Sequence, residues 1–122
     1  MKKLIFIAVV LFATVATAQN YIAPKPNERQ LTEAKELARE IDKRISLTEI
    51  QLLDVEQLNG EFIARRDEIV GNRELSIERK NELLAAMYKE QSREMADIVT
   101  RRQLRRYRRV RGDIQPLIIL EK

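Results

Sequence analysis

The segment LTEIQLLDVEQLNGEFIARRDEIV, residues 47–70, decides the fold class of this chain. Its apolar residues recur at intervals of three, four and seven positions, which places them on one face of an α-helix: Leu52, Val55, Leu58, Phe62 and Ile69. The pattern predicts a helix over Glu49–Val70. Asn59-Gly60 is a turn signal that could divide this helix. Because the apolar stripe stays in phase across Gly60, we favour one continuous helix, with glycine costing about 1 kcal/mol relative to alanine.

The same periodicity predicts three more helices, over Glu28 to about Arg44, Ile77–Val99, and Arg101 to about Arg111. Strict alternation of apolar and polar residues, which is typical of a half-buried strand, is absent from residue 19 onward. The sequence therefore predicts an all-α fold.

The second and third of these helices are expected to form a long antiparallel hairpin, flanked by the two shorter helices. Gly71-Asn72 would end the second helix, because glycine accepts the left-handed conformation without strain. Ser76 would cap the start of the third helix.

Three of the predicted helices begin with the same local motif, a capping residue followed three positions later by glutamine. The pairs are Asn27 with Gln30, Thr48 with Gln51, and Thr100 with Gln103. In such a capping box the cap side chain accepts a bond from the backbone N–H of the glutamine, whose side chain accepts one from the N–H of the cap. Leu47 and Val99 precede the two threonines and can pack on the leucine five positions later.

The N-terminus has the pattern of a secretory signal peptide. Lys2 and Lys3 precede an apolar run from Leu4, and Ala16-Thr17-Ala18 is a small-x-small cleavage site. We expect cleavage after Ala18, a flexible lead-in over residues 19–27, a helical domain over 28–111 and an apolar tail over 112–122. The chain is expected to be exported to the periplasm.

The chain contains no histidine and no cysteine. The commonest ligands for zinc, copper, haem and iron–sulfur clusters are therefore absent, and disulfides cannot form. Ser–His and Cys–His nucleophile pairs are excluded as well. We expect no catalytic site, no metal site and no cofactor.

Leu47-Thr48-Glu49-Ile50-Gln51 is a full LTxxQ motif, and Val99-Thr100-Arg101-Arg102-Gln103 repeats it with valine in place of leucine. Two such motifs, bracketing a helical hairpin behind a signal peptide, resemble the LTxxQ (Spy/CpxP-like) family of periplasmic proteins. The resemblance covers about Leu31 to Val110. It implies a cradle-shaped antiparallel homodimer and an ATP-independent role in envelope stress, holding unfolded proteins or sensing misfolding. Metal-responsive relatives use histidine ligands, so that branch of the family is not expected here.

The predicted fourth helix carries seven arginines in eleven residues and no acid: Arg101, Arg102, Arg105, Arg106, Arg108, Arg109 and Arg111. Without the signal the chain has 23 − 2 = 21 basic and 19 acidic residues, and outside this cluster 14 basic against the same 19. The arginines could pair with glutamates of the other helices or of a partner subunit. They could also contact an acidic client or partner domain, or anionic lipid of the envelope. Nucleic acid is not expected, because an exported protein rarely meets it.

Several large apolar side chains have two interpretations: Phe62, Met87, Tyr88, Met95 and Tyr107. They form either the internal seam of the hairpin or an exposed concave face that binds clients. Arg65 and Arg66 interrupt the apolar stripe of the second helix and would give such a face a mixed apolar and cationic character. The tail segment Leu117–Leu120 either docks on the helices of the chain or serves as a disordered or partner-binding segment.

These observations lead to an expectation of a periplasmic, ATP-independent chaperone or stress adaptor that binds unfolded or misfolded envelope proteins. One alternative is a regulatory partner that docks through its arginine-rich segment on an acidic sensor domain. Another is a peripheral structural protein of the envelope.

Overall fold

The computed structural model describes residues 24–121 of the chain. These residues form α2 (Glu28–Ile45), α3 (Glu49–Gly71), α4 (Ile77–Ile98) and α5 (Arg101–Ile114), and none of them forms a strand. The all-α prediction is confirmed. The predicted signal peptide, its cleavage site and residues 19–23 of the predicted lead-in lie outside the described residues.

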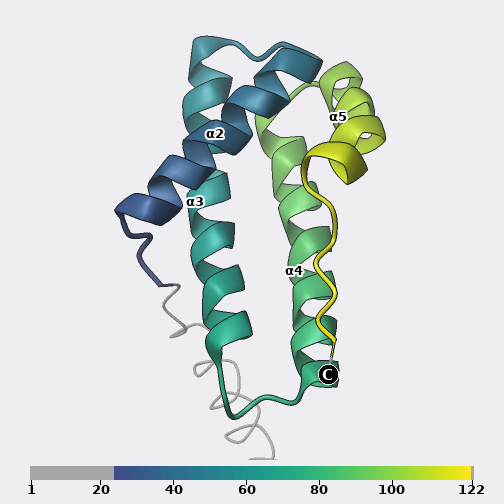
Figure 1. Ribbon diagram of the computed structural model, residues 1–122. Coiled ribbons are helices and arrows are strands. Elements are labelled where there is room, and N and C mark those ends of the chain that lie inside the picture. The colour runs from purple at the N-terminus through teal and green to yellow at the C-terminus, as the bar shows by residue number, and fades with distance from the viewer. Residues whose placement is uncertain (1–23, 122) are drawn as a thin grey trace, which may run out of the picture.

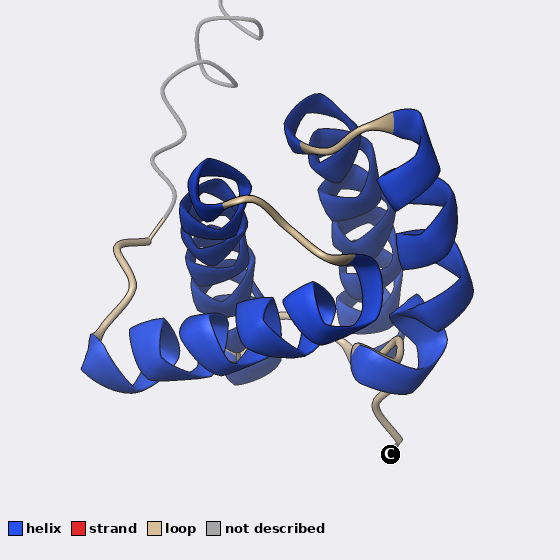
Figure 2. Cartoon of the chain, turned by 90° about the horizontal axis from the view of Figure 1, so that it is seen from above, coloured by secondary structure: helices blue, strands red, loops and turns tan. Residues whose placement is uncertain are grey.

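Helices α3 and α4 form the predicted antiparallel hairpin (Figure 1). Their 23 and 22 residues correspond to arms of about 33–35 Å at 1.5 Å per residue. Helix α2 lies across α3 and reaches α5, while α5 packs beside α4 (Figure 2). The face that carries α2, turned toward the viewer in Figure 1, is called the front face below.

The hairpin turn differs in detail from the prediction. Gly71 is the last residue of α3, but no glycine among residues 24–121 has a positive φ, so the predicted left-handed glycine cap is wrong. Asn72 instead follows in an extended conformation, and its side chain accepts a hydrogen bond from the N–H of Glu74 at 2.9 Å. Ser76 caps α4 as predicted, since its hydroxyl accepts from the N–H of Arg79.

The left-handed backbone lies at another corner, between α2 and α3. Ser46 has φ 58°, a region that residues with a side chain adopt at some cost. Asp42 supports this corner twice: its carbonyl accepts from the N–H of Ser46, and its carboxylate accepts from the N–H of Leu47 at 2.7 Å. These two bonds turn the chain sharply into the first LTxxQ motif.

Helix α3 continues without a break through Gly60, as the apolar stripe predicted. Gly60 is buried beneath α2 and the segment that leads into it. A Cβ atom at this position would lie 3.6 Å from side-chain atoms of both Leu31 and Pro26, and 3.9 Å from Ala34. The small residue thus marks the place where α2 crosses α3.

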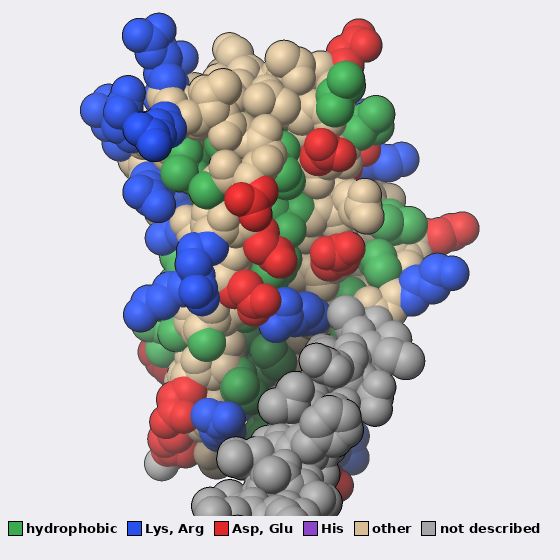
Figure 3. All heavy atoms as spheres, turned by 180° about the vertical axis from the view of Figure 1, so that it is seen from behind, with side chains coloured by type: hydrophobic (Ala, Val, Ile, Leu, Met, Phe, Trp, Pro, Cys, Tyr) green, Lys and Arg blue, Asp and Glu red, His purple; other side chains and the backbone are tan. Residues whose placement is uncertain are grey.

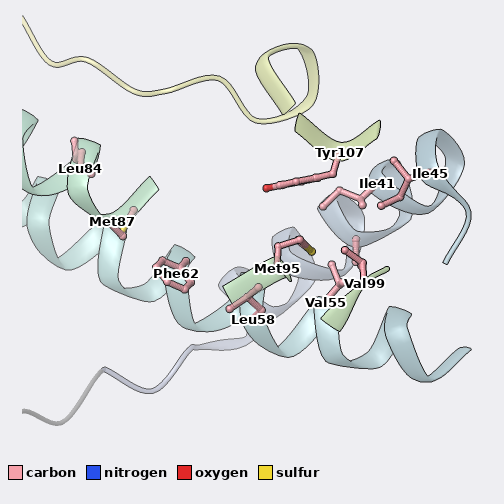
Figure 4. Packing of buried hydrophobic residues seen from close by; sticks show 11 residues of the cluster. Ile41, Ile45, Val55, Leu58, Phe62, Leu84, Met87, Met95, Val99 and Tyr107 are labelled. Atoms are coloured by element: carbon pink, nitrogen blue, oxygen red, sulfur yellow. The ribbon is translucent and has the colours of Figure 1, made fainter. Parts of the chain in front are cut away.

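The hydrophobic core draws on all four helices (Figure 4). Its members are Ala38, Ile41, Ile45, Val55, Leu58, Phe62, Leu84, Met87, Met95, Val99 and Tyr107. Full burial of a large apolar side chain contributes about 1.5–3 kcal/mol, so this cluster is the main source of stability.

Residues 115–121, called the tail below, leave α5 and run in a non-helical conformation along α4 toward the hairpin turn (Figure 1). The side chain of Gln115 donates to Gln91 of α4 at 2.7 Å. Further along, Leu120 exchanges two hydrogen bonds with the side chain of Asn81. The interpretation that the tail docks on the helices of its own chain is confirmed.

Candidate functional site

The two LTxxQ motifs are both complete capping boxes. Thr48 Oγ1 accepts from the N–H of Gln51 at 3.2 Å, and Gln51 Oε1 accepts from the N–H of Thr48 at 3.0 Å. The corresponding distances for Thr100 and Gln103 are 3.2 and 2.8 Å. The predicted boxes at the starts of α3 and α5 are therefore confirmed, as is the box at the start of α2.

The glutamines of the two motifs also bind each other. Gln51 Nε2 donates to Gln103 Oε1, and Gln103 Nε2 donates to Gln51 Oε1, both at 2.9 Å. Each amide also donates to a carbonyl of the segment that leads into the other motif, Ile98 O at 3.3 Å and Ser46 O at 2.8 Å. The two motifs thus meet in a nearly symmetric contact that fastens the start of α3 to the start of α5.

The first residue of each motif, Leu47 or Val99, faces inward. Val99 is buried and Leu47 is partly buried, and both pack on the core. The polar members are occupied by bonds within the chain, so the motifs hold the fold together and present no side-chain amide for a ligand.

A chain of hydrogen-bonded side-chain amides, called the amide relay below, connects α2, α3, α4 and α5; Asn59 and Gln91 are buried and Gln115 is partly buried. Tyr107 Oη donates to Gln115 Oε1 at 3.2 Å, and Gln115 Nε2 donates to Gln91 Oε1 at 2.7 Å. Gln91 Nε2 then donates to Asn59 Oδ1 at 3.2 Å, and Asn59 Nδ2 to the carbonyl of Ala34 at 3.3 Å. Among residues 24–121, every buried side-chain nitrogen and oxygen has a partner.

The front face carries an apolar cavity of about 290 Å³, at the small end of the range for ligand pockets. Its lining comes from all four helices and the tail, and the apolar part consists of Leu37, Phe62, Ile63, Leu84, Met87, Tyr88, Ile114, Pro116, Leu117 and Ile118. Leu84, Met87 and Phe62 lie in a row along one side, and the tail runs opposite them (Figure 4). Polar groups are few, namely Glu33, Arg66, Gln91 and Gln115.

Four residues predicted to form an exposed client surface are buried instead. Phe62, Met87, Met95 and Tyr107 have exposed fractions of 2%, 9%, 0% and 1%. Of the two interpretations, burial in the interior is confirmed for these side chains and an open apolar face is wrong, because α2 and α5 cover the stripes of the hairpin. Phe62 and Met87 still line the cavity, whereas Met95 and Tyr107 belong to the core alone.

Arg65 and Arg66, also predicted to contact clients, are held within the chain. Arg66 pairs with Glu33 of α2 at 2.8 Å and with Asp67 at 2.9 Å. Arg65 pairs with Glu90 of α4 at 3.2 Å. Neither guanidinium is a free cation. The prediction that Arg65 and Arg66 contact clients is therefore wrong, and these two side chains connect α3 to its neighbours instead.

Asp67 is the centre of this charged cluster. Burial opposes its ionisation, but hydrogen bonds from Gln30, Arg66 and Arg29 outweigh burial and lower the pKa of its carboxyl group. Burial likewise favours a neutral Arg66, yet its bonds to Glu33 and Asp67 raise the pKa of its guanidinium. The cluster is therefore charged and internally neutralised at one edge of the cavity.

Six arginines of α5 are exposed: Arg101, Arg102, Arg105, Arg106, Arg108 and Arg109. None of them forms an ion pair with any residue between 24 and 121. The interpretation that these arginines pair with glutamates of the same chain is therefore wrong. Helix α5 is held by its apolar face, on which Tyr107 is buried and Leu104 is partly buried. Arg111 differs, since its guanidinium lies 4.0 Å from the ring centre of Tyr88 at the cavity.

Negative charge gathers on the back of the hairpin (Figure 3). Asp54, Glu61, Glu94 and Asp97 line a shallow groove between α3 and α4. Burial, together with repulsion from Glu90 and Glu61, raises the pKa of Glu94. The cations of α5 occupy one edge of the same view, so the molecule has the charge separation that the sequence predicts.

Sequence reasoning missed the polar residues that organise the interior and the tail: Asn59, Asn81, Gln91 and Gln115. A signal exists for two of them. Asn59 lies between Val55 and Phe62 on the apolar stripe, and Gln91 lies four residues before Met95. A polar residue in phase with an apolar stripe indicates a buried, hydrogen-bonded amide.

Comparison of the chain with family models, with curated proteins and with solved structures gives no match. The resemblance to the LTxxQ family therefore stays a hypothesis based on the paired motifs. Within residues 24–121, none of the helices combines the length and the apolar character needed to cross a bilayer.

Proposed function

We propose that this protein is an exported, ATP-independent chaperone or envelope-stress adaptor that binds unfolded or misfolded segments of other proteins. The observation that supports it best is the apolar cavity on the front face, which has beside it one cation, Arg111, without an ion pair to the described part of the chain. Met87 contributes to its lining, and methionine adapts to varied partners. Arg111, stacked on Tyr88, brings positive charge to the same place.

Two features of the sequence support the remaining parts of the proposal. The pattern of Met1–Ala18 favours export, and no glycine-rich phosphate loop is present that would favour use of a nucleotide. An unfolded envelope protein offers apolar segments for the cavity and acidic segments for the exposed arginines of α5. The proposed mode of binding is therefore broad in specificity and dependent on salt.

The test is suppression of aggregation of several unrelated denatured proteins by the purified protein without ATP. Leu37→Ser changes a cavity residue, and Val70→Ser changes an exposed apolar residue outside the cavity. We expect suppression by the wild type and by Val70→Ser, and a several-fold loss for Leu37→Ser at unchanged helicity. A wild-type protein that suppresses none of these aggregations would refute the proposal.

A second candidate is a regulatory or peripheral protein that docks through α5 on an acidic domain or on anionic lipid. The six exposed arginines without an ion pair favour it, because their charge is not used inside the chain. Juxtaposed basic residues contribute about 1 kcal/mol each at an anionic membrane surface.

Neutralisation of four of these arginines separates the two candidates. The variant replaces Arg105, Arg106, Arg108 and Arg109 with glutamine, and a control replaces four exposed cations elsewhere, Lys35, Arg39, Arg73 and Arg93. If α5 docks on anionic surfaces, only the first variant loses binding to phosphatidylserine vesicles or to an acidic domain. Its melting temperature should equal that of the wild type, since no internal ion pair is removed. Equal binding by both variants would exclude docking through α5.

A further inference from the structure

We propose that the front face is a binding site for extended apolar polypeptide, and that the tail occupies this site in cis as a built-in competitor. The inference rests on the proposed function, because it identifies where a client segment would bind. It starts from the way in which α4 holds the tail.

The tail is non-helical and runs lengthwise along α4 (Figure 1). Its contacts begin with Gln115 at Gln91 and end with Leu120 at Asn81. Ten residues of α4 rise about 15 Å at 1.5 Å each, and five residues of extended chain span about 17 Å at 3.3 Å each. The two lengths are similar, so a nearly extended path of residues 115–120 spans the stretch of α4 between the two contacts.

The side chain of Asn81 binds the backbone of the tail. The N–H of Leu120 donates to Asn81 Oδ1 at 2.7 Å, and Asn81 Nδ2 donates to the carbonyl of Leu120 at 3.0 Å. One side-chain amide thus satisfies both polar groups of one residue, as a neighbouring strand would. Every residue except proline offers this pair of groups, so the contact does not depend on which side chain is bound.

The side chains of the tail are only partly covered. Leu117 and Ile118 line the cavity but remain 41% and 40% exposed, and Ile119 is 68% exposed. Leu120 packs against the core. The tail therefore forms one wall of the cavity and leaves the space between itself and the helices unfilled. An extended segment with similar residues can take the place of the tail and make the same contacts.

A client segment and the tail would need the same amide of Asn81 and the same place along α4, so only one can be bound at a time. When a competitor occupies a site for most of the time, the apparent affinity equals the intrinsic affinity multiplied by the fraction of molecules in which the site is open. A tail docked in nine molecules of ten weakens client binding about tenfold. The tail would thus set the affinity for clients.

The first test measures binding of a labelled peptide with the sequence QPLIILEK, residues 115–122, to the full chain by fluorescence polarisation. Leu117→Ser with Leu120→Ser releases the tail, and Ile119→Ser is the matched control, since Ile119 does not line the cavity. We expect the released variant to bind the peptide about tenfold more tightly than the wild type, and the control to match the wild type. Adding Asn81→Ala to the released variant should abolish the gain.

A second measurement does not depend on any variant. Hydrogen exchange of the Leu120 amide in the wild type should be slow, and it should accelerate when a denatured client protein is bound. Unchanged protection of Leu120 in a client complex, or a released variant that keeps native helicity and binds no more peptide than the wild type, would overturn the inference.

These results are separable from those for the proposed function. Suppression of aggregation by a protein whose released variant fails to bind the peptide would leave the chaperone proposal standing and remove the front-face site. Peptide binding by the released variant, without suppression of aggregation by any form, would keep the site and remove the chaperone activity.

Discussion

The reciprocal bond between Gln51 and Gln103 makes one structural unit of the two LTxxQ motifs, and a double-mutant cycle can measure it. Gln51→Ala removes the bond from the N–H of Thr48, the bond to Ile98 O and both bonds shared with Gln103. Gln103→Ala removes the equivalent set at the other motif. The shared pair is therefore lost in either single variant.

The expected magnitudes follow from these contacts. A net hydrogen bond contributes about 0.5–1.5 kcal/mol, and the loss of a helix cap costs about 1 kcal/mol. Each single substitution should lower the free energy of unfolding by about 2–3 kcal/mol. Either single substitution already removes the shared pair of hydrogen bonds. The decrease in the free energy of unfolding of the double variant should therefore be about 1–2 kcal/mol smaller than the sum of the two single decreases. Helix propensity adds little, because glutamine and alanine are both good helix formers.

The assay is urea unfolding followed by far-ultraviolet circular dichroism, with the four free energies compared at equal slope. Gln57→Ala is the control, since Gln57 is an exposed glutamine on α3 and should change stability by less than about 0.5 kcal/mol. Additive losses from Gln51→Ala and Gln103→Ala, to within about 0.5 kcal/mol, would refute the view that the motifs act as one unit.

Three other predictions follow from features described above. Gly60→Ala should stabilise the fold by about 0.5–1 kcal/mol, because the added methyl group makes only ordinary contacts with Leu31 and Pro26; a lower melting temperature would contradict this. Burial raises the pKa of Tyr107 to about 12, so tyrosinate absorbance should show one late-titrating phenol. In the unfolded chain the phenol has its ordinary pKa of about 10. The raised pKa therefore contributes roughly 2–3 kcal/mol to the free energy of unfolding, and this contribution is complete below about pH 10 and falls as the pH rises toward 12. A free energy of unfolding that is flat or rising over this range would contradict the assignment. Finally, the homodimer stays a prediction, in which Ile50 and Leu53, 73% and 64% exposed on α3, would contact a second copy of the chain. Sedimentation at micromolar concentration should give twice the monomer mass, and a monomer would exclude the dimer.

The features that sequence reasoning predicted correctly are local ones. Helical periodicity identified all four helices, and the Thr-x-x-Gln spacing identified the caps, because both depend on residues within a few positions of each other. The continuity of α3 through Gly60 was also predictable, since the stripe on either side of it is in phase. The left-handed residue was misplaced from Ser46 to Gly71, because glycine is the usual residue in that conformation, whereas at Ser46 the nearby oxygens of Asp42 accept the bonds that hold a serine there.

The candidate site was harder to predict, because it depends on which helix packs over the apolar stripe of which other helix. Periodicity shows that Phe62 and Met87 lie on apolar faces, but only the crossing of α2 and the docking of the tail decide that they are buried. The same holds for charge: sequence alone cannot tell that Arg66 is paired with Glu33 while Arg105 is unpaired. Long-range pairs of this kind carry no local signature.

The amide relay has a consequence for the way in which the chain unfolds. Withdrawal of any one helix breaks a link and leaves an amide of Asn59 or Gln91 without its partner in an apolar interior, at a cost of about 1–3 kcal/mol. This cost raises the free energy of partly unfolded forms relative to the native chain. The four helices should melt cooperatively in a single transition, with the slowest-exchanging amides of α2 and α5 opening at the same free energy as those of the hairpin.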